Sequence, residues 1–353
     1  MLLVFLLCGV LWGMGHLMGA PHAARMTMIG LLYVAVLGLH VALPNGHPLR
    51  MATGESPALW LIIGGFALLI FLYREGLGRL KQRAHATEAH AEGATPVRLF
   101  SESELNRYAR HMVLREIGGP GQKKLKQARV LVIGAGGLGA PVLQYLAAAG
   151  VGTIGVIDDD VVENANLQRQ VIHRDASIGM PKVFSAQAEM EAQNPYVTVR
   201  PYNRRLDEDI AADLFDEYDL IVDGTDNFDS RYLANRTAVE KGLPLISGAL
   251  SQWEGQISVF HPAQGAPCYQ CVFDSPPARE LAPSCAEAGV LGPLPGVVGS
   301  MMAAEAVKVL TAAGQPLLGQ MLIYDALFGE SRTIALKPRP DCPTCGMLQR
   351  KSS

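Results

Sequence analysis

The chain has 353 residues, of which 49% are hydrophobic, and its formal net charge at pH 7 is −3. This length suits one domain of about 250 residues together with an accessory segment. The near-neutral charge excludes the strongly basic composition of most nucleic-acid-binding proteins, so we expect no nucleic-acid partner.

The first 73 residues are almost uncharged and contain three apolar stretches, at residues 2–20, 27–43 and 58–73. A membrane-spanning helix needs about 20 apolar residues, and these stretches lie near the short end of the usual range. Because soluble domains seldom contain three consecutive helices without a charged face, we predict about three transmembrane helices in a membrane anchor at residues 1–83. Buried core helices are the alternative. A cleaved signal peptide is a second alternative for residues 1–24, although a basic N-terminal region is missing.

Basic residues near these stretches indicate an orientation. Four of them follow the third stretch: Arg74, Arg79, Lys81 and Arg83. By the positive-inside rule the N-terminus then lies outside, and the residues from 74 onward lie in the cytoplasm. We therefore expect a multi-pass protein of the inner membrane whose larger domain is cytoplasmic. The polar, Ala-rich residues 84–96 are expected to form a linker to a domain at 97–353.

The larger domain is expected to begin with an amphipathic helix. Residues 101–104, Ser-Glu-Ser-Glu, have the spacing of a capping box, in which the first and last side chains satisfy each other's backbone N–H groups. The predicted helix leads into Arg107, Tyr108 and Arg110.

Residues 129–157 have the pattern of a βαβ nucleotide-binding unit. An apolar strand at 129–133 leads into Gly134-Ala-Gly136-Gly137-Leu-Gly139, and a helix ending near Gly150 connects to a second strand at 153–157. The glycines let the backbone approach phosphates, and the helix N-terminus offers amide donors. The second strand ends on Asp158-Asp-Asp160, where an acidic side chain can accept hydrogen bonds from a ribose. Glycines that serve only a tight turn are the alternative.

The residues after the second strand favour a triphosphate over a dinucleotide. Asn166-Leu-Gln168-Arg169 and Met180-Pro-Lys182 supply two amides and two cations, with Lys182 in the first turn of a predicted helix. Two cations match the charge of a triphosphate, although each one alone is more often a surface residue.

A further strand at 219–222 ends in Asp223-Gly-Thr-Asp226-Asn227. Ligands of open α/β sheets bind at the carboxyl ends of strands, so we expect Asp226 to face the phosphates across a Mg²⁺ ion. The P-loop sequence G-x-x-x-x-G-K-[ST] is missing, which argues against a P-loop fold.

The cysteines divide into two C-x-x-C pairs and two single residues. Cys268/Cys271 and Cys342/Cys345 can supply the four thiolates of a tetrahedral, structural Zn²⁺ site in a reducing compartment. Four unrelated buried cysteines are the alternative. Cys285 lies in a predicted loop, and a nucleophilic role would require a lowered thiol pKa.

These motifs resemble those of the MoeB/ThiF/HesA family, relatives of the ubiquitin-activating enzymes. The resemblance extends from about Leu105 to Gly346 and includes Arg107-Tyr-Ala-Arg110, residues 130–139, Asp158-Asp-Asp160, Asn166-Leu-Gln-Arg169, Pro181-Lys182, Asp223-Gly-Thr-Asp-Asn227, Glu254-Gly-Gln256, Cys285-Ala-Glu-Ala-Gly289 and both C-x-x-C pairs. Residue 224 is Gly where relatives often have Cys. The N-terminal apolar region has no counterpart in typical members.

The resemblance implies ATP-dependent adenylation of the C-terminal glycine carboxylate of a ubiquitin-like sulfur-carrier protein, with release of pyrophosphate. The MoeB branch, which acts on a MoaD-type carrier for molybdenum cofactor biosynthesis, is the most similar. The alternative is a ThiS-type carrier for thiamine biosynthesis. No rhodanese-like domain follows within the 353 residues, so we expect a separate sulfur donor such as a cysteine desulfurase.

The resemblance also implies roles for individual residues. Gly137 and Asp158 would contact the nucleotide, with Asp158 on the ribose. Arg169 and Lys182 would hold the phosphates, and Asn166 and Gln168 would line the same pocket. Asp226 would bind Mg²⁺ and is the residue most needed for adenylation.

Two further residues carry implied roles. Arg110 would reach across a homodimer interface into the partner's ATP site. Cys285 matches the cysteine that carries an acyl-persulfide link in ThiF-type enzymes, although adenylation of the MoeB type does not require it.

The expected fold is α/β: a Rossmann-like, doubly wound, mainly parallel sheet, preceded by the transmembrane helices. Antiparallel strands are expected near residues 256–261 and 321–324, close to the zinc site, with a helix at 299–310 packed beneath. An NAD-dependent oxidoreductase would share the βαβ unit but would leave the two cations, Asp226 and the zinc cysteines without a role. An inactive membrane scaffold would have a damaged site, and the motifs are intact.

Overall fold

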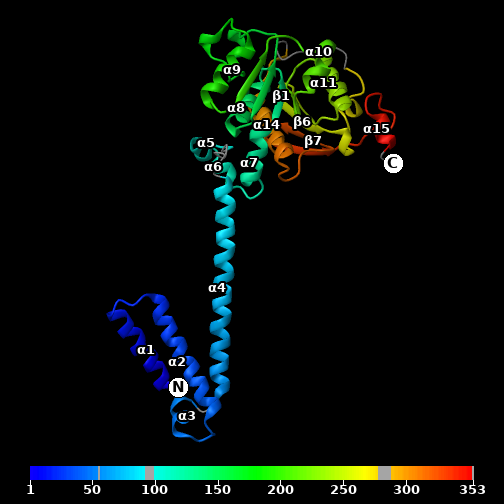
Figure 1. Ribbon diagram of the computed structural model, residues 1–353. Helices are drawn as coiled ribbons and strands as arrows, with labels where there is room; N and C mark the ends of the chain where they lie inside the picture. The colour runs from blue at the N-terminus through cyan, green and yellow to red at the C-terminus, as the bar shows by residue number, and fades with distance from the viewer. Residues whose placement is uncertain (55, 92–98, 277–287, 352–353) are drawn as a thin grey trace. The chain divides into compact units, whose positions relative to one another are not determined.

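The computed structural model describes residues 1–54, 56–91, 99–276 and 288–351. Its internal contacts divide the chain into two compact units, Met1–Val97 and Arg98–Ser353. Figure 1 shows the first unit in blue to cyan and the second in cyan to red.

The first unit consists of helices (Figure 1): α1 (Leu2–Leu17), α2 (His22–Ala42), α3 (Pro48–Thr53) and α4 (Pro57–Ala91). Val4, Val36 and Trp60 form its small buried cluster. By length and composition, α2 and the Pro57–Arg79 part of α4 could cross a membrane, whereas α1 has only 16 residues. Helix α14 of the second unit also meets these criteria, but half of it is buried inside the protein.

Helix α4 continues to Ala91, into the segment that was expected to be a linker. Alanine, the best helix former, makes up half of residues 84–91. Farther back in the helix, Glu75 and Arg79 form an i,i+4 ion pair at 3.4 Å. The polar composition therefore extends the helix instead of ending it.

An eight-stranded sheet with the order β3-β2-β1-β4-β5-β6-β7-β8 forms the centre of the second unit. Strands β1 to β5 are parallel, and β6, β7 and β8 add on in antiparallel pairs. The strands are β1 (Arg129–Ile133), β2 (Thr153–Ile157), β3 (Thr198–Tyr202), β4 (Leu220–Asp223), β5 (Leu245–Leu250), β6 (Glu254–Phe260), β7 (Gln320–Asp325) and β8 (Glu330–Ala335). The predicted mainly parallel sheet with antiparallel C-terminal strands is confirmed.

Helices cover both faces of the sheet (Figure 1). They are α5 (Glu102–Arg107), α6 (Ala109–Met112), α7 (Gly118–Gln127), α8 (Gly139–Ala149), α9 (Lys182–Gln193), α10 (Glu208–Phe215), α11 (Phe228–Lys241), α12 (Tyr269–Val272), α14 (Pro293–Thr311) and α15 (Gly346–Lys351). Short 3₁₀ turns lie at Asn164–Asn166, Asp175–Ser177 and Pro262–Gln264.

The side chains of β1 point alternately into two hydrophobic cores, one on each face of the sheet. Val130 and Val132 belong to the core that includes α8 and α14, whereas Leu131 and Ile133 belong to the core that includes α10 and α11. Successive side chains of a strand point to opposite faces, so a fully apolar strand requires cover on both. The predicted helix at 299–310 is part of α14, which packs on α8, β5 and β6.

Strand register brings the predicted motifs to one edge of the sheet. Ile133 at the end of β1 pairs with Ile157 of β2 and with Asp223 of β4. The order of strands reverses between β1 and β4, and such a switch point is where open α/β sheets bind ligands. The glycine loop, the acidic triplet and the Asp226 turn all begin at this point.

Candidate active site

A cavity of about 750 Å³ lies at the carboxyl ends of β1, β2 and β4. It is lined by most of the predicted nucleotide-site residues: Gly134, Gly136, Gly137, Asp158, Asp160, Arg169, Lys182, Asp226 and Asn227. Gly139, Asn166 and Gln168 are not among the described residues that line it. The structure thus brings together motifs that are separated by up to about ninety residues in the sequence.

The glycines of the loop serve two purposes. Gly134 has a φ of 93°, and a Cβ on Gly139 would lie 1.9 Å from the Gly134 carbonyl oxygen, so both shape the turn. Gly134, Gly136 and Gly137 line the cavity. The tight-turn interpretation therefore describes Gly139, the ligand-facing interpretation describes Gly136 and Gly137, and Gly134 fits both.

Asp158 is held by backbone N–H groups at the end of β2. Its Oδ2 accepts from Ala135 at 2.7 Å, and its Oδ1 accepts from Asp160 at 2.8 Å. Burial raises the pKa of Asp158, while the charge of Lys182 and these two hydrogen bonds oppose the increase. Each carboxylate oxygen keeps a lone pair free of these bonds, so the side chain can still accept from a ligand hydroxyl.

The two predicted cations reach the cavity from different elements. Lys182 begins α9 and is buried, and its Nζ lies 2.7 Å from Oδ2 of the exposed Asp160. Arg169 donates to Ala165 O at 3.1 Å and to Asn166 Oδ1 at 3.2 Å. Asn166 therefore orients Arg169 from outside the cavity.

A buried network of polar side chains supports the turn after β4, which carries Asp226. Asp223 accepts from Thr225 N at 3.0 Å, Thr225 Oγ1 at 2.6 Å and Ser247 Oγ at 2.9 Å. The guanidinium of Arg231, 3.7 Å from Asp223, donates to Ser247 Oγ at 3.1 Å, to Gly248 O at 2.7 Å and to Thr225 O. These contacts fix the turn to β5 and leave Asp226 exposed at the cavity.

Several residues of the site were not predicted from the sequence. Those that line the cavity include Gln170, Arg204, Arg205, Arg231, Tyr269 and Phe273. Arg231 is buried on α11 beside the buried Tyr232 and Asn235, and only the structure shows this burial. A charged residue in such a place requires a partner.

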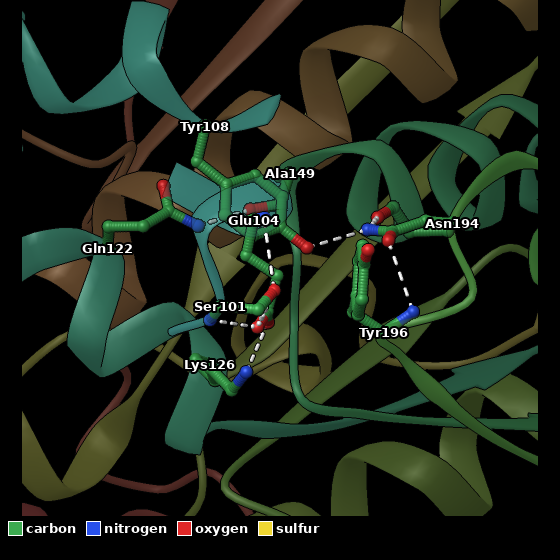
Figure 2. Close-up of polar contacts among 9 residues, drawn as sticks. Ser101, Glu104, Tyr108, Gln122, Lys126, Ala149, Asn194 and Tyr196 are labelled. Atoms are coloured by element: carbon green, nitrogen blue, oxygen red, sulfur yellow. Dashed lines mark hydrogen bonds and ion pairs between the residues drawn. The ribbon is translucent and has the colours of Figure 1, made fainter. Parts of the chain in front are cut away.

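The segment that carries Arg110 begins with the predicted capping box, which is confirmed (Figure 2). Ser101 Oγ accepts from Glu104 N at 3.2 Å, and Glu104 Oε2 accepts from Ser101 N at 2.8 Å. The buried Glu104 also pairs with Lys126 of α7. Although burial opposes ionisation, the bonds from Lys126 and Ser101 lower the pKa of Glu104.

Tyr108 fixes the other end of this segment (Figure 2). Its hydroxyl accepts from Asn194 Nδ2 at 2.8 Å, and a Cβ on Gly150 would lie 2.4 Å from its ring. Arg110, two residues later, is exposed and is not among the described residues that line the cavity of its own chain. Cys285 lies outside the described residues.

The four cysteines of the C-x-x-C pairs form one buried cluster. The sulfur–sulfur distances are 3.9 Å for Cys268–Cys271, 3.6 Å for Cys268–Cys342 and 3.3 Å for Cys271–Cys345. Zinc–sulfur bonds of about 2.3 Å at tetrahedral angles place sulfurs about 3.8 Å apart, whereas a disulfide requires about 2.05 Å. The cluster therefore fits a four-thiolate Zn²⁺ site.

Hydrogen bonding already favours a thiolate in this cluster. The Cys268 thiol donates to Cys271 Sγ, as does the backbone N–H of Arg339 at 3.4 Å, and these bonds lower the pKa of Cys271 although burial opposes this. Tyr269, between the two cysteines of the first pair, lines the cavity and packs on Phe273. The proposed metal knuckle is thus continuous with the cavity wall.

The model of the family described as "ThiF family" matches residues 108–344, about two thirds of the chain. The chain belongs to the ThiF family. This confirms the family predicted from the motifs.

Curated relatives of this ThiF-family chain have related names. The "Sulfur carrier protein adenylyltransferase" of Thermus thermophilus is 50% identical over 251 residues, which cover 70% of this chain and 93% of the relative. The "SAMP-activating enzyme E1" of Haloferax volcanii is 46% identical and is covered to 90%. The "Probable adenylyltransferase/sulfurtransferase MoeZ" of Mycobacterium tuberculosis is 50% identical, but this chain spans only 64% of its length.

Solved structures agree on the fold. A crystal structure of E. coli MccB with ATP has a TM-score of 0.59 and 25% identity, covering 71% of this chain and 77% of that one. PaaA has a TM-score of 0.60 at 22% identity and covers 72% of this chain, which is a likeness of fold alone.

Proposed function

We propose that this chain is an adenylyltransferase that uses ATP to activate the C-terminal glycine carboxylate of a ubiquitin-like sulfur-carrier protein and releases pyrophosphate. The observation that carries the proposal is the cavity at the strand switch point, where the glycine loop, Asp158, two cations and Asp226 converge. The similarity to relatives that are named as sulfur carrier protein adenylyltransferases supports the choice of substrate.

The cavity supplies binding and alignment. Asp158 accepts from the ribose hydroxyls, and the N–H groups of the glycine loop and the N-terminus of α8 face the phosphates. Arg169 and Lys182 place fixed positive charge beside them. Mg²⁺, when bound, would neutralise part of the triphosphate charge, and Asp226 is the residue that would hold it.

The chemistry requires no general base. A C-terminal carboxylate is already ionised at pH 7, so it attacks the α-phosphate of ATP directly and pyrophosphate leaves. Negative charge builds up on the phosphate oxygens as the new bond forms. Lys182 can stabilise this negative charge, because its Nζ lies beside the carboxylate of the exposed Asp160 and can move from it to the phosphates.

We propose a homodimer in which Arg110 enters the partner's cavity. Two features support it: Arg110 is exposed, and Tyr108 fixes its segment to the domain without directing Arg110 into its own cavity. A MoaD-type carrier remains the preferred substrate and a ThiS-type carrier the alternative, with sulfur supplied by a separate donor such as a cysteine desulfurase. The role of Cys285 as a persulfide carrier stays a prediction.

We also propose that residues 1–83 anchor the enzyme in the inner membrane as a multi-pass segment and that residues 97–353 form the adenylyltransferase domain in the cytoplasm. The apolar side chains of α4 support this, since Phe66, Leu69 and Phe71 are each more than 60% exposed in the protein. A bilayer would cover such side chains. In the second unit, a structural Zn²⁺ held by the four clustered cysteines would fasten the C-terminal segment to the domain.

An ATP–pyrophosphate exchange assay on the full chain in detergent tests the proposal. MoaD-type and ThiS-type carriers are compared, with Asp226→Ala as the inactivating variant. Asp229→Ala is the matched control, because Asp229 is an exposed acid three residues away that does not line the cavity in the described structure. We expect exchange that depends on one carrier, is lost in Asp226→Ala and persists in Asp229→Ala. If the protein binds ATP but shows no exchange with either carrier, the proposal is refuted.

A further inference from the structure

A buried histidine lies directly behind the glycine loop. His173 is 5% exposed, and its Nε2 is 2.9 Å from the carbonyl oxygen of Ala135. Its Nδ1 is 3.0 Å from Oγ of Ser185, a buried residue of α9. The reaction proposed above assigns no role to either side chain.

The two contacts define one tautomer of the ring. A carbonyl oxygen can only accept, so Nε2 carries the hydrogen and donates it to Ala135. Nδ1 then accepts from the Ser185 hydroxyl. Burial lowers the pKa of His173, and the charge of Lys182 adds to this, while Asp158, Glu189 and the bond to Ala135 oppose it. The lowered pKa favours the neutral ring, in which Nδ1 accepts from the Ser185 hydroxyl.

The hydrogen bond from His173 to the Ala135 carbonyl sets the orientation of the Ala135–Gly136 peptide. In a planar trans peptide, the C=O and the following N–H point in opposite directions. Because the Ala135 carbonyl faces His173, the N–H of Gly136 is directed away from His173, and Gly136 lines the cavity. None of the described residues accepts a hydrogen bond from this N–H.

The preceding peptide unit is also fixed, because the Ala135 N–H donates to Asp158 at 2.7 Å. Ala135 is therefore held on both sides, by Asp158 and by His173. Gly136 itself has no Cβ and permits many backbone conformations, so it cannot hold its own peptide in place. Without the donor on His173, the Ala135–Gly136 peptide could rotate and present a carbonyl oxygen to the phosphates.

We propose that His173, supported by Ser185, is a positioning residue for nucleotide binding that keeps the Gly136 N–H directed at the phosphates of ATP. This rests on the proposed function only in taking ATP as the ligand. The effect should be specific to phosphates, because the ribose contact belongs to Asp158.

The test measures dissociation constants of ATP and of adenosine for the full chain in detergent, without a carrier protein. Asn in place of His173 is too short to donate from the position of Nε2, whereas the amide of Gln reaches close to it. We expect His173→Asn to weaken ATP binding about tenfold or more, the loss of one hydrogen bond to a charged ligand, and to leave adenosine binding unchanged. His173→Gln should stay within about threefold of the parent chain for both ligands.

The chain offers a matched control in His261, whose Nε2 lies 3.1 Å from the carbonyl oxygen of Gly242, away from the cavity lining. His261→Asn should leave ATP binding unchanged. If His173→Asn does not fold, Ser185→Ala replaces it and should produce a smaller loss that is again confined to ATP. Equal weakening of ATP and adenosine, equal effects of Asn and Gln, or unchanged ATP binding in His173→Asn would each overturn the inference. A parent chain that binds no ATP would instead refute the proposed adenylation.

Discussion

Replacing Arg231 by Met should strongly destabilise the second unit, because it leaves a buried carboxylate without its cation. Asp223 is 1% exposed and Arg231 is 6% exposed. Removing one partner of a buried ion pair costs about 3–5 kcal/mol. Asp223 keeps its bonds from Thr225 and Ser247, which reduces the loss, but two carbonyl oxygens also lose a charged donor.

We therefore expect a loss of about 4 kcal/mol from the free energy of unfolding. For a unit of this size, 1 kcal/mol corresponds to roughly 2–4 °C in Tm, so the expected decrease is about 8–16 °C. Thermal denaturation of the full chain in detergent, followed by circular dichroism, measures it.

The same helix provides the comparison. Arg236 of α11 pairs with Glu208 at 3.0 Å, and the two side chains are 49% and 80% exposed. Exposed pairs contribute about 0–1 kcal/mol, so Arg236→Met should lower Tm by less than about 4 °C. Similar decreases for the two variants would refute the reasoning, because burial would then not decide the cost.

Two further predictions concern the cysteine cluster and Glu104. Purified protein should contain one zinc per chain by elemental analysis; Cys342→Ser should lose the metal and lower Tm, whereas Cys8→Ser, outside the cluster, should retain it. Because the folded pKa of Glu104 lies below its ordinary value of 4.5, its contribution to stability is present above that pH and is lost as the pH falls through the lower folded value. Tm measured from pH 7 down to pH 3 should therefore fall more steeply for the parent chain than for Glu104→Gln, and parallel curves would contradict this.

The strands that the sequence predicted are those with apolar residues on both faces or with clear alternation. The other three, β3, β5 and β8, lack this signal for physical reasons. In β5, Ser247 and Gly248 interrupt the apolar run. β8 is exposed along its whole length, so nothing apolar marks it. β3 is an edge strand that contains Arg200 and Pro201, and a central strand would not tolerate that proline.

The candidate site also contains residues that the sequence predicts and residues that it does not. Its glycines and acids belong to local motifs whose spacing carries the information. Arg231 and His173 act through partners on other elements, Gly248 of β5 and Ala135 of the glycine loop. Those contacts exist only after the chain has folded, so sequence spacing alone could not predict them.

The apolar composition of α14 has a consequence for how the chain folds during synthesis. Its mean hydropathy of 1.2 is below the 1.6 of α2 and the 1.8 of α4, yet it also qualifies as a candidate span. If residues 1–83 anchor the chain in a membrane as proposed, such a helix could also insert into the bilayer during synthesis. However, β4, β5 and β6, which α14 packs against, precede it in the chain and leave the ribosome first. The order of synthesis thus provides a protein surface for α14 to bury itself on as soon as it emerges.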